Sequence, residues 1–244
     1  MTQVSLVLPA YNESERLEET VRKVAESLHK ITSSFEIIIA EDGSTDGTGK
    51  IAEELADKHQ YVKYLHNDER LGRGKALNRA FKSSEGEILA YIDVDLATDL
   101  AHLPELIEHT REECDLATGS RMLPESDVVR SVKRGIASRG FNFLVRALLR
   151  SKLYDHQCGF KAFRREVAFD LLDQVRDCHW FWDTEILVLA QRSGYRVVEF
   201  PIRWRPKGAT KVDLVADVLG MGRAILRLWW GLKRDGMVAQ TAHD

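Results

Sequence analysis

The sequence predicts an α/β protein in which helices flank a mostly parallel sheet. Short apolar runs of three to six residues alternate with longer amphipathic stretches through the first half of the chain. Runs of this length suit buried strands. Strand–helix alternation of this kind produces βαβ units with parallel strands. The carboxyl ends of such strands meet at one edge of the sheet, where ligands bind.

The expected elements follow in chain order from this pattern. We expect strands at Val4–Leu8, Phe35–Ala40, Val62–Leu65, Ile88–Ile92 and Leu116–Thr118. The stretches between them predict helices at Glu15–Leu28, Thr48–Lys58, Lys75–Ser83 and Leu100–Glu113. In the second half we expect a basic helix in Arg130–Lys152, a helix at Asp183–Ser193, a strand at Arg196–Pro201 and a last helix at Val212–Leu232. Without a repeat or a low-complexity linker, residues 1–211 are expected to form one domain, followed by an amphipathic helix and tail at 212–244.

The composition excludes several classes of protein. The 244 residues are 44% hydrophobic and 30% charged, which is typical of globular proteins and unlike disordered or fibrous ones. A formal charge of -3 gives no basic excess for nucleic acid. Three scattered cysteines predict neither a disulfide framework nor a zinc site, and favour a reduced, cytoplasmic setting. We expect no transmembrane helix and no secretory signal.

Polar residues follow the first two expected strands. Tyr11, just after Pro9, offers a flat ring for stacking, although this segment also reads as an ordinary turn with an N-cap. Asp42 lies directly at the end of the second strand, where an acid accepts hydrogen bonds from a base or a ribose. Asp46 or Thr48 is expected to cap the next helix, which leaves Asp42 for another role.

Two further motifs follow. Gly72-Arg73-Gly74-Lys75 opens a helix, and a helix N-terminus with cations predicts an anion site that includes Lys75. Asp93 and Asp95 stand two residues apart after the fourth strand. Two such carboxylates repel each other unless a cation compensates, so they predict a site for a hard divalent cation.

These four motifs, in this order, resemble those of family-2 glycosyltransferases, which have the Rossmann-like GT-A fold. The resemblance implies that Asp42 binds the nucleobase and that Pro9, Tyr11 and Glu13 line the nucleotide pocket. It also implies that Asp93, Val94 and Asp95 form the Asp-x-Asp motif, in which Asp93 and Asp95 hold Mg²⁺ or Mn²⁺ on the donor diphosphate.

The second half resembles polyprenyl-phosphate sugar synthases, through Gly119-Ser120-Arg121, Arg134 with Ser138, 155–163, 180–185 and 205–211. Dolichyl-phosphate mannose synthases usually carry a metal-assisting glutamine where this chain has Ala97. Dolichyl-phosphate β-glucosyltransferases carry Asp-Ala-Asp-Gly-Ala-Thr, which is close to residues 93–98, where this chain has Val94 and Leu96 in place of the alanine and the glycine. We therefore favour UDP-glucose over GDP-mannose as donor. A non-catalytic nucleotide-sugar-binding module and a transferase acting on a soluble glycan are the alternatives.

The implied acceptor is dolichyl or another polyprenyl phosphate, which is largely dianionic at neutral pH and needs no strong base. The expected task of the enzyme is positioning and charge control. Candidates to clamp the acceptor phosphate or the diphosphate are Arg121, Arg134, Ser138, Arg205 and Lys211. Asp93, Asp95, Arg121 and Asp183 are the candidate catalytic residues, and Asp183 is equally well explained as a helix N-cap. By resemblance, the transfer inverts an α-linked donor to a β-linked product.

Two segments predict peripheral attachment to the cytoplasmic face of a membrane. Arg130–Lys152 contains seven basic residues and no carboxylate, which suits anionic headgroups. In the last helix, Leu214, Val218, Met221, Ile225, Leu228 and Leu232 form an apolar stripe. Such a stripe is typical of a helix in the membrane interface, and the alternative is that both segments pack these faces on the core.

Overall fold

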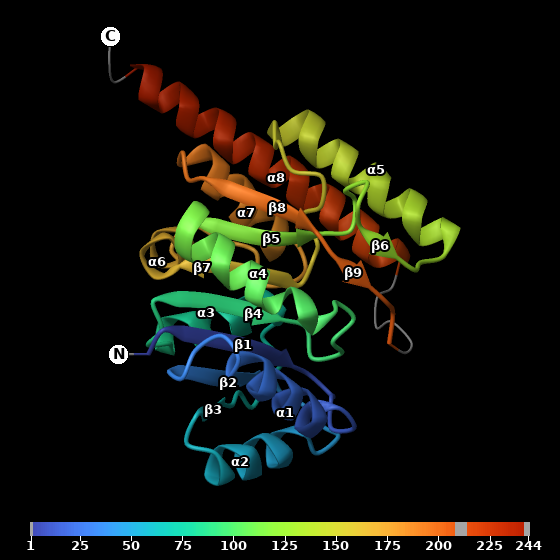
Figure 1. The fold of residues 1–244 in the computed structure, drawn as a ribbon. Helices are drawn as coiled ribbons and strands as arrows, with labels where there is room; N and C mark the ends of the chain where they lie inside the picture. Colours follow the sequence, from blue (N-terminus) through green and yellow to red (C-terminus); the bar gives the residue numbers. More distant parts are fainter. Residues whose placement is uncertain (1, 208–213, 242–244) are drawn as a thin grey trace.

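The computed structural model describes residues 2–207 and 214–241, with side chains for 2–207 and 220–234. Within these residues, seven strands form the main sheet in the order β3-β2-β1-β4-β7-β5-β8. They are β1 (Val4–Ala10), β2 (Phe35–Glu41), β3 (Val62–Leu65), β4 (Ile88–Ile92), β5 (Leu116–Ser120), β7 (Phe160–Arg164) and β8 (Val197–Pro201). All neighbouring pairs are parallel except those of β7, which runs antiparallel to β4 and β5. The predicted mostly parallel α/β fold is confirmed (Figure 1).

Helices cover both faces of this sheet. One face is covered by α1 (Leu17–Leu28), α2 (Thr48–Lys58) and α4 (Leu103–Glu108). The other is covered by α3 (Arg73–Ser83), α6 (Arg165–Leu172) and α7 (Trp182–Arg192). A 3₁₀ turn at Leu100–His102 and a π-helical turn at His109–Glu113 extend α4 at its two ends. Two long helices, α5 (Val132–Leu149) and α8 (Leu214–Thr241), lie beside the β5–β8 end of the sheet (Figure 1).

Side chains of β1 alternate between two hydrophobic clusters. Leu6 and Leu8 enter the cluster under α1, α2 and α4, whereas Val7 enters the cluster that contains Phe81 and Trp182. This period of two is that of a pleated strand buried on both faces. Each fully buried side chain of this size contributes about 1.5–3 kcal/mol to folding.

A third cluster joins α8 to the rest of the domain. Ile225 and Leu228 of α8 are 2% and 7% exposed and pack with Val145 of α5 and Val188 of α7. The expectation that the apolar stripe of the last helix faces a membrane is therefore wrong for these two residues. The expected boundary between residues 211 and 212 and the side chains of Leu214 and Val218 lie outside the described residues. Within the described part of the chain, no helix combines the length and apolarity needed to cross a bilayer.

The second half contains elements that the sequence patterns did not reveal. These are β7 with α6 after it, and a second, two-stranded sheet of β6 (Asp127–Val128) and β9 (Arg203–Trp204). The second residue of β7 is Lys161, which is fully buried and interrupts the apolar run that would have marked a strand. Both elements carry residues to the carboxyl edge of the sheet.

Candidate active site

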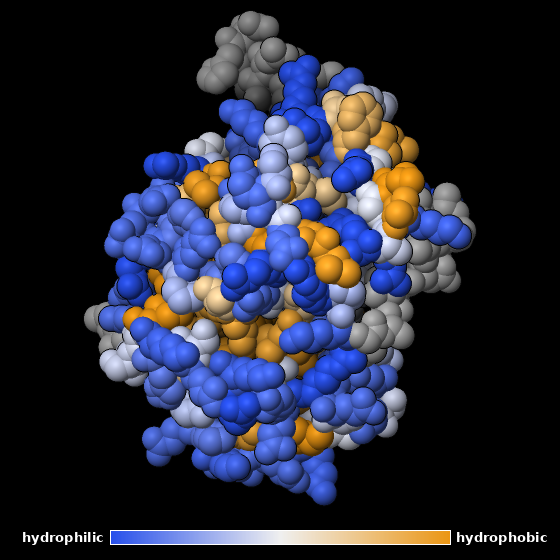
Figure 2. All heavy atoms as spheres, turned by 45° about the vertical axis from the view of Figure 1, so that its right-hand side comes forward, coloured by the Kyte–Doolittle hydropathy of each residue, from blue (hydrophilic) through white to orange (hydrophobic). Residues whose placement is uncertain are grey.

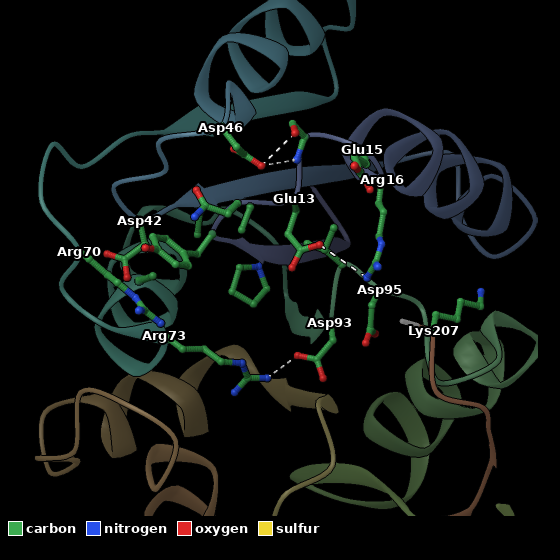
Figure 3. Close-up of a pocket in the computed structure, with 18 of the residues that line it drawn as sticks. Glu13, Glu15, Arg16, Asp42, Asp46, Arg70, Arg73, Asp93, Asp95 and Lys207 are labelled. Carbon is green, nitrogen blue, oxygen red and sulfur yellow. Dashed lines mark hydrogen bonds and ion pairs between the residues drawn. The ribbon is translucent and has the colours of Figure 1, made fainter. Parts of the chain in front are cut away.

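A cavity of about 550 Å³ opens where β1, β2 and β4 end (Figure 3). The sequence predicts a ligand site at this edge. Seven of the eight residues expected to bind a nucleotide sugar line the cavity: Pro9, Tyr11, Glu13, Asp42, Asp93, Val94 and Asp95. The eighth, Lys75, is exposed on α3 and does not line it. The neighbouring cation Arg73 takes that place instead.

One end of the cavity has an aromatic ring, a carboxylate and a cation. The guanidinium carbon of Arg70 lies 4.0 Å from the centroid of the Tyr11 ring. Asp42 is 4% exposed, and its two oxygens accept hydrogen bonds at 2.8 Å from the backbone N–H groups of Leu71 and Gly72. Asp42 therefore fixes the loop that carries Arg70 as well as facing the cavity.

The acid pair follows β4 directly, as predicted. The Asp93 side chain is 46% exposed, and its backbone N–H donates to the carbonyl oxygen of Gly159 at 3.2 Å. One Asp95 oxygen accepts a hydrogen bond from the Ala97 N–H at 2.9 Å. Burial and the nearby Asp93 carboxylate raise the pKa of Asp95 above its ordinary value. A cation between the two acids would relieve this unfavourable charge.

The turn after the acid pair contains Leu96, one of the two departures from the expected motif; the other is Val94. Leu96 has φ +48, in the left-handed region that favours glycine, and its N–H donates to the Asp93 carbonyl oxygen at 3.1 Å. The glycine of the β-glucosyltransferase pattern suits that backbone. Here leucine occupies the same turn at a cost of about 1–2 kcal/mol, and its side chain is 8% exposed in the core.

Arg73 connects the acid pair to Asp183. Its Nη2 donates to Asp93 at 2.7 Å and its Nη1 to Asp183 at 2.5 Å, and its side chain is 13% exposed. Figure 3 shows Arg73 reaching from α3 toward Asp93 across the floor of the cavity. The sequence placed an anion site in this glycine-rich segment but assigned it to Lys75.

Asp183 makes no capping bond at the start of α7. Its carboxylate accepts hydrogen bonds from Arg73, from the Tyr91 hydroxyl and, at 2.8 Å, from the Lys161 ammonium. The interpretation of Asp183 as a helix cap is therefore wrong. Burial raises the pKa of Asp183, and burial together with the charge of Arg73 lowers the pKa of Lys161.

The glycines around Arg73 allow close packing with the segment before α7. A Cβ on Gly72, which has φ +102, would overlap His179 and the Cys178 carbonyl oxygen. A Cβ on Gly74 would lie 2.8 Å from the Trp182 Cβ. This close packing brings α3, which carries Arg73, against α7, which carries Asp183.

Of the five residues expected to hold an acceptor phosphate, the four that the structure describes do not line this cavity. Arg121 instead pairs with the fully buried Asp155 through Nε at 2.7 Å and Nη2 at 2.9 Å. Arg205 pairs with Asp127 at the surface. Arg134 and Ser138 lie on α5, and Lys211 falls outside the described residues.

Several cavity residues were not predicted. The cationic and aromatic ones among them are Arg16, Arg70, Arg73, Trp180, Trp204 and Lys207. Trp180 and Lys207 belong to sequence segments that the resemblance had marked, but these two residues had not been assigned. Arg16 pairs with Glu13 at 3.9 Å, on the side of the cavity that holds Asp95 (Figure 3).

Comparison of the chain with known proteins identifies its family. The model of the family described as glycosyl transferase family 2 matches residues 5–172. Over 94% of its length the chain is 56% identical to glycosyltransferase AglD of Haloferax volcanii, but it spans only 37% of that protein. It is 33% identical, over 92% of its length, to a dolichyl-phosphate beta-glucosyltransferase of Dictyostelium discoideum, of which it spans 73%.

A solved structure shares the fold. It is glucosyl-3-phosphoglycerate synthase from Mycobacterium tuberculosis in complex with Mn²⁺, UDP and glucosyl-3-phosphoglycerate. The TM-score is 0.65 at 21% identity, over 93% of this chain and 78% of the other. At this identity, the likeness concerns the fold alone. It agrees with the expected GT-A architecture.

Proposed function

Because the chain belongs to glycosyl transferase family 2 and is therefore a glycosyltransferase, we propose that it transfers glucose from UDP-glucose to dolichyl phosphate or a similar polyprenyl phosphate. The relatives named dolichyl-phosphate beta-glucosyltransferase support this sugar and this acceptor. The observation that carries the proposal is that one cavity joins Tyr11 and Asp42 to the acid pair Asp93 and Asp95. The proposed product is a β-linked lipid-phosphate sugar.

In this proposal the nucleobase stacks on Tyr11, where Arg70 now lies over the ring. A carboxylate offers about four lone-pair positions, so Asp42 accepts a further hydrogen bond from the base in addition to those from Leu71 and Gly72. The donor diphosphate then extends toward Asp93 and Asp95.

Asp93 and Asp95 fit a divalent cation, Mg²⁺ or Mn²⁺. Their oxygens are the donors that such hard ions prefer, and the raised pKa of Asp95 reflects burial and a neighbouring charge that a cation offsets. Among the described residues, no group of three or more His, Cys, Asp or Glu is placed to hold a metal. Diphosphate and water oxygens would therefore complete the coordination. When bound, the ion stabilises the charge of the leaving diphosphate.

The acceptor is its own nucleophile, because a phosphate monoester is largely dianionic near pH 7. Asp183 is already held by Arg73, Lys161 and Tyr91. We assign it a positioning role: it holds Arg73 beside the acid pair, where the guanidinium meets the anionic donor.

The acceptor lipid requires contact with a bilayer, and α5 supports such a contact. Five apolar side chains of α5 are exposed: Val132, Ile136, Phe143, Leu144 and Leu148. Figure 2 shows hydrophobic side chains gathered at the upper right of the molecule, where α5 lies. Basic residues interleave with them, which suits an anionic lipid surface. In this proposal α5, and not the stripe of α8, lies against the membrane.

Flotation with vesicles of neutral or acidic phospholipid tests this membrane contact. The double substitution Ile136→Asp and Phe143→Asp is expected to reduce binding to acidic vesicles at least tenfold. The control is Leu226→Asp, which changes an exposed apolar side chain of α8. Equal binding of the α5 variant and the wild type would contradict the contact.

The activity is tested with purified protein, Mn²⁺ or Mg²⁺, dolichyl phosphate and radiolabelled UDP-glucose or GDP-mannose in parallel. Lipid-phase label from UDP-glucose, lost in Asp95→Asn and kept in Asp99→Asn, supports the proposal. Asp99 is a suitable control because it accepts a bond from the Ala101 N–H outside the cavity.

If only GDP-mannose gives lipid-phase label, the proposed acceptor would stand and the proposed donor, UDP-glucose, would be wrong. Donor binding without lipid label would overturn the acceptor. Soluble glycans would then be tested in its place, and if they too accept no sugar, a nucleotide-sugar-binding module would remain.

A further inference from the structure

Lys161 is a buried cation on an apolar face of the sheet. It lies in β7 opposite Tyr91 of β4, and its side chain is fully buried. Opposite residues of an antiparallel pair point to the same face, which is here the face under α7. Phe163, two residues further along β7 on that face, packs edge-on against Phe81 and Trp182. A charge in such surroundings is costly unless hydrogen-bonded partners compensate it.

Two acceptors on different elements compensate this charge. Lys161 Nζ donates to an oxygen of Asp183 in α7 at 2.8 Å, and to the carbonyl oxygen of Cys158 in the segment before β7. The same Asp183 oxygen accepts a hydrogen bond from the Tyr91 hydroxyl. Lys161 itself does not line the cavity, so any effect that it has on the reaction passes through these partners.

The contact with Asp183 leads to the first acid of the pair. The second oxygen of Asp183 accepts a hydrogen bond from Arg73 Nη1 at 2.5 Å. Nη2 of the same guanidinium donates to Asp93 at 2.7 Å, the bond drawn in Figure 3. Two cations therefore share the charge of Asp183. Without Lys161, Arg73 would neutralise Asp183 alone and would be drawn away from Asp93.

The contact with Cys158 leads to the same acid from another side. Gly159 follows Cys158 directly, and its carbonyl oxygen accepts a hydrogen bond from the backbone N–H of Asp93 at 3.2 Å. Cys158 is 1% exposed, so the core encloses the start of this segment. One ammonium therefore supports Asp93 twice, through its side chain and through its backbone.

Stability alone does not account for a lysine at this position. A buried ion pair can often be exchanged for apolar side chains of similar volume without loss of stability. The surrounding cluster is apolar and aromatic and would accept such side chains. A buried polar network in which every member is bonded instead fixes one arrangement of the groups that it joins. The groups joined here are those that hold Asp93.

We propose that Lys161 is a positioning residue that places Asp93 for the divalent cation of the donor. It acts through Asp183 and Arg73 on one side and through the segment of Cys158 and Gly159 on the other. This inference rests on the proposed function, because that function requires a cation at the acid pair. Outer partners that orient a metal ligand commonly contribute 10- to 100-fold to metal affinity or activity.

Binding of Mn²⁺ in the presence of UDP, followed by electron paramagnetic resonance, measures the placement of Asp93 without turnover. Lys161→Met has a similar length but neither charge nor donor. It is expected to weaken Mn²⁺ binding about tenfold and to lower kcat about 10- to 100-fold. The KM for the prenyl phosphate should stay within about twofold, since this network does not hold the acceptor. Lys161→Arg, which keeps the charge, should recover part of both losses.

Lys63→Met is the matched control. Lys63 is also a strand lysine, it pairs with Glu36 and Glu85, and it does not line the cavity. Thermal unfolding of both variants separates stability from positioning. A less stable Lys161→Met that keeps wild-type Mn²⁺ affinity and kcat would show a purely structural role and overturn the inference. If Lys161→Met does not fold, Lys161→Gln, which keeps an amide donor, is measured in its place and should still lose at least threefold in Mn²⁺ affinity.

A double-mutant cycle tests the route through Asp183. Because Lys161 acts partly through this acid, Lys161→Met combined with Asp183→Asn should lose less Mn²⁺ affinity than the product of the two single losses. A loss equal to that product would overturn the proposed route.

The two proposals fail in different ways. Wild type that binds Mn²⁺ with UDP but transfers no sugar to a prenyl phosphate would overturn the proposed acceptor, while the Mn²⁺ affinity of Lys161→Met would still decide the role of Lys161. Wild type that binds no Mn²⁺ in the presence of UDP would overturn the metal site and the inference with it.

Discussion

Gly159 lies directly against the carboxylate of Asp93. A Cβ on Gly159 would overlap the carboxyl carbon and both oxygens of that acid. The Gly159 carbonyl oxygen also accepts the Asp93 N–H. The turn before β7 therefore sets where the first acid of the pair stands.

Gly159→Ala is expected to reduce transfer about 100-fold, because displacing Asp93 by even an ångström misplaces the metal and the donor. Steady-state kinetics with a fixed donor and acceptor measure the loss. Gly140→Ala on α5 is the control, since its added Cβ meets nothing within 4 Å. Full activity of Gly159→Ala would contradict the role given to this contact.

Asp95→Asn is expected to weaken Mn²⁺ binding at least tenfold and transfer about 1000-fold, because it removes one charge of a two-acid site. Electron paramagnetic resonance of free Mn²⁺ in the presence of UDP reports the binding directly. Chelation by EDTA should abolish wild-type transfer, with recovery when Mn²⁺ or Mg²⁺ is returned. Asp99→Asn should match the wild type, and transfer that survives EDTA would argue against a metal.

Arg73→Lys is expected to lose about 10- to 100-fold in kcat, since a single ammonium cannot span Asp93 and Asp183 as the two guanidinium nitrogens do. The same exchange at Arg79, exposed on α3 and bonded to Asn67, is the control. The stability of both variants is measured by thermal unfolding. Equal kinetics of Arg73→Lys and the wild type would mean that the bridge has no part in transfer.

His156 is expected to make folding sensitive to acid. It is buried and bonded to Asn142 and Ser151, each at 2.7 Å, and burial lowers its pKa to about 4. The folded state therefore binds this proton less readily than the unfolded state, whose histidine has a pKa near 6.5. The free energy of unfolding should have its full value above about pH 6.5. It should decrease by up to about 3 kcal/mol as the pH falls toward 4.

Urea unfolding at pH 7.0, 5.5 and 4.5 measures this slope. His156→Gln should flatten the dependence of the free energy of unfolding on pH. His29→Gln, at an exposed position, should leave that dependence unchanged. Parallel pH profiles for wild type and His156→Gln would assign the acid sensitivity to other groups.

The residues that the sequence identified best stand at the ends of parallel strands. Tyr11, Asp42 and Asp93 each follow an apolar run, and the topology of a parallel sheet brings such ends together whatever the details of the helices. Arg73 was missed in favour of Lys75, because the rotation of α3 about its axis decides which cation faces the cavity. That rotation depends on how Gly72 and Gly74 pack against the segment before α7.

The second half was less predictable for a different reason. Lys161 is fully buried in β7 and is stabilised by Asp183, a partner that only tertiary structure reveals. Arg121 was expected to face a substrate, but it is held by the buried Asp155. The periodicity of apolar residues indicates which side chains face the core. It does not indicate which charged side chains are buried as ion pairs.

The reversed strand β7 lies between β4 and β5 in the sheet, although it follows both in the chain. During synthesis, one edge of β4 therefore has unpaired backbone N–H and C=O groups until residues 160–164 have emerged. Until then Asp93 also lacks the neighbouring Gly159 turn. A fragment that stops before β7 would keep every nucleotide-binding motif, but it would leave the edge of β4 that pairs with β7 exposed. The donor-binding half is thus not a separable module, and truncated chains should aggregate rather than bind nucleotide.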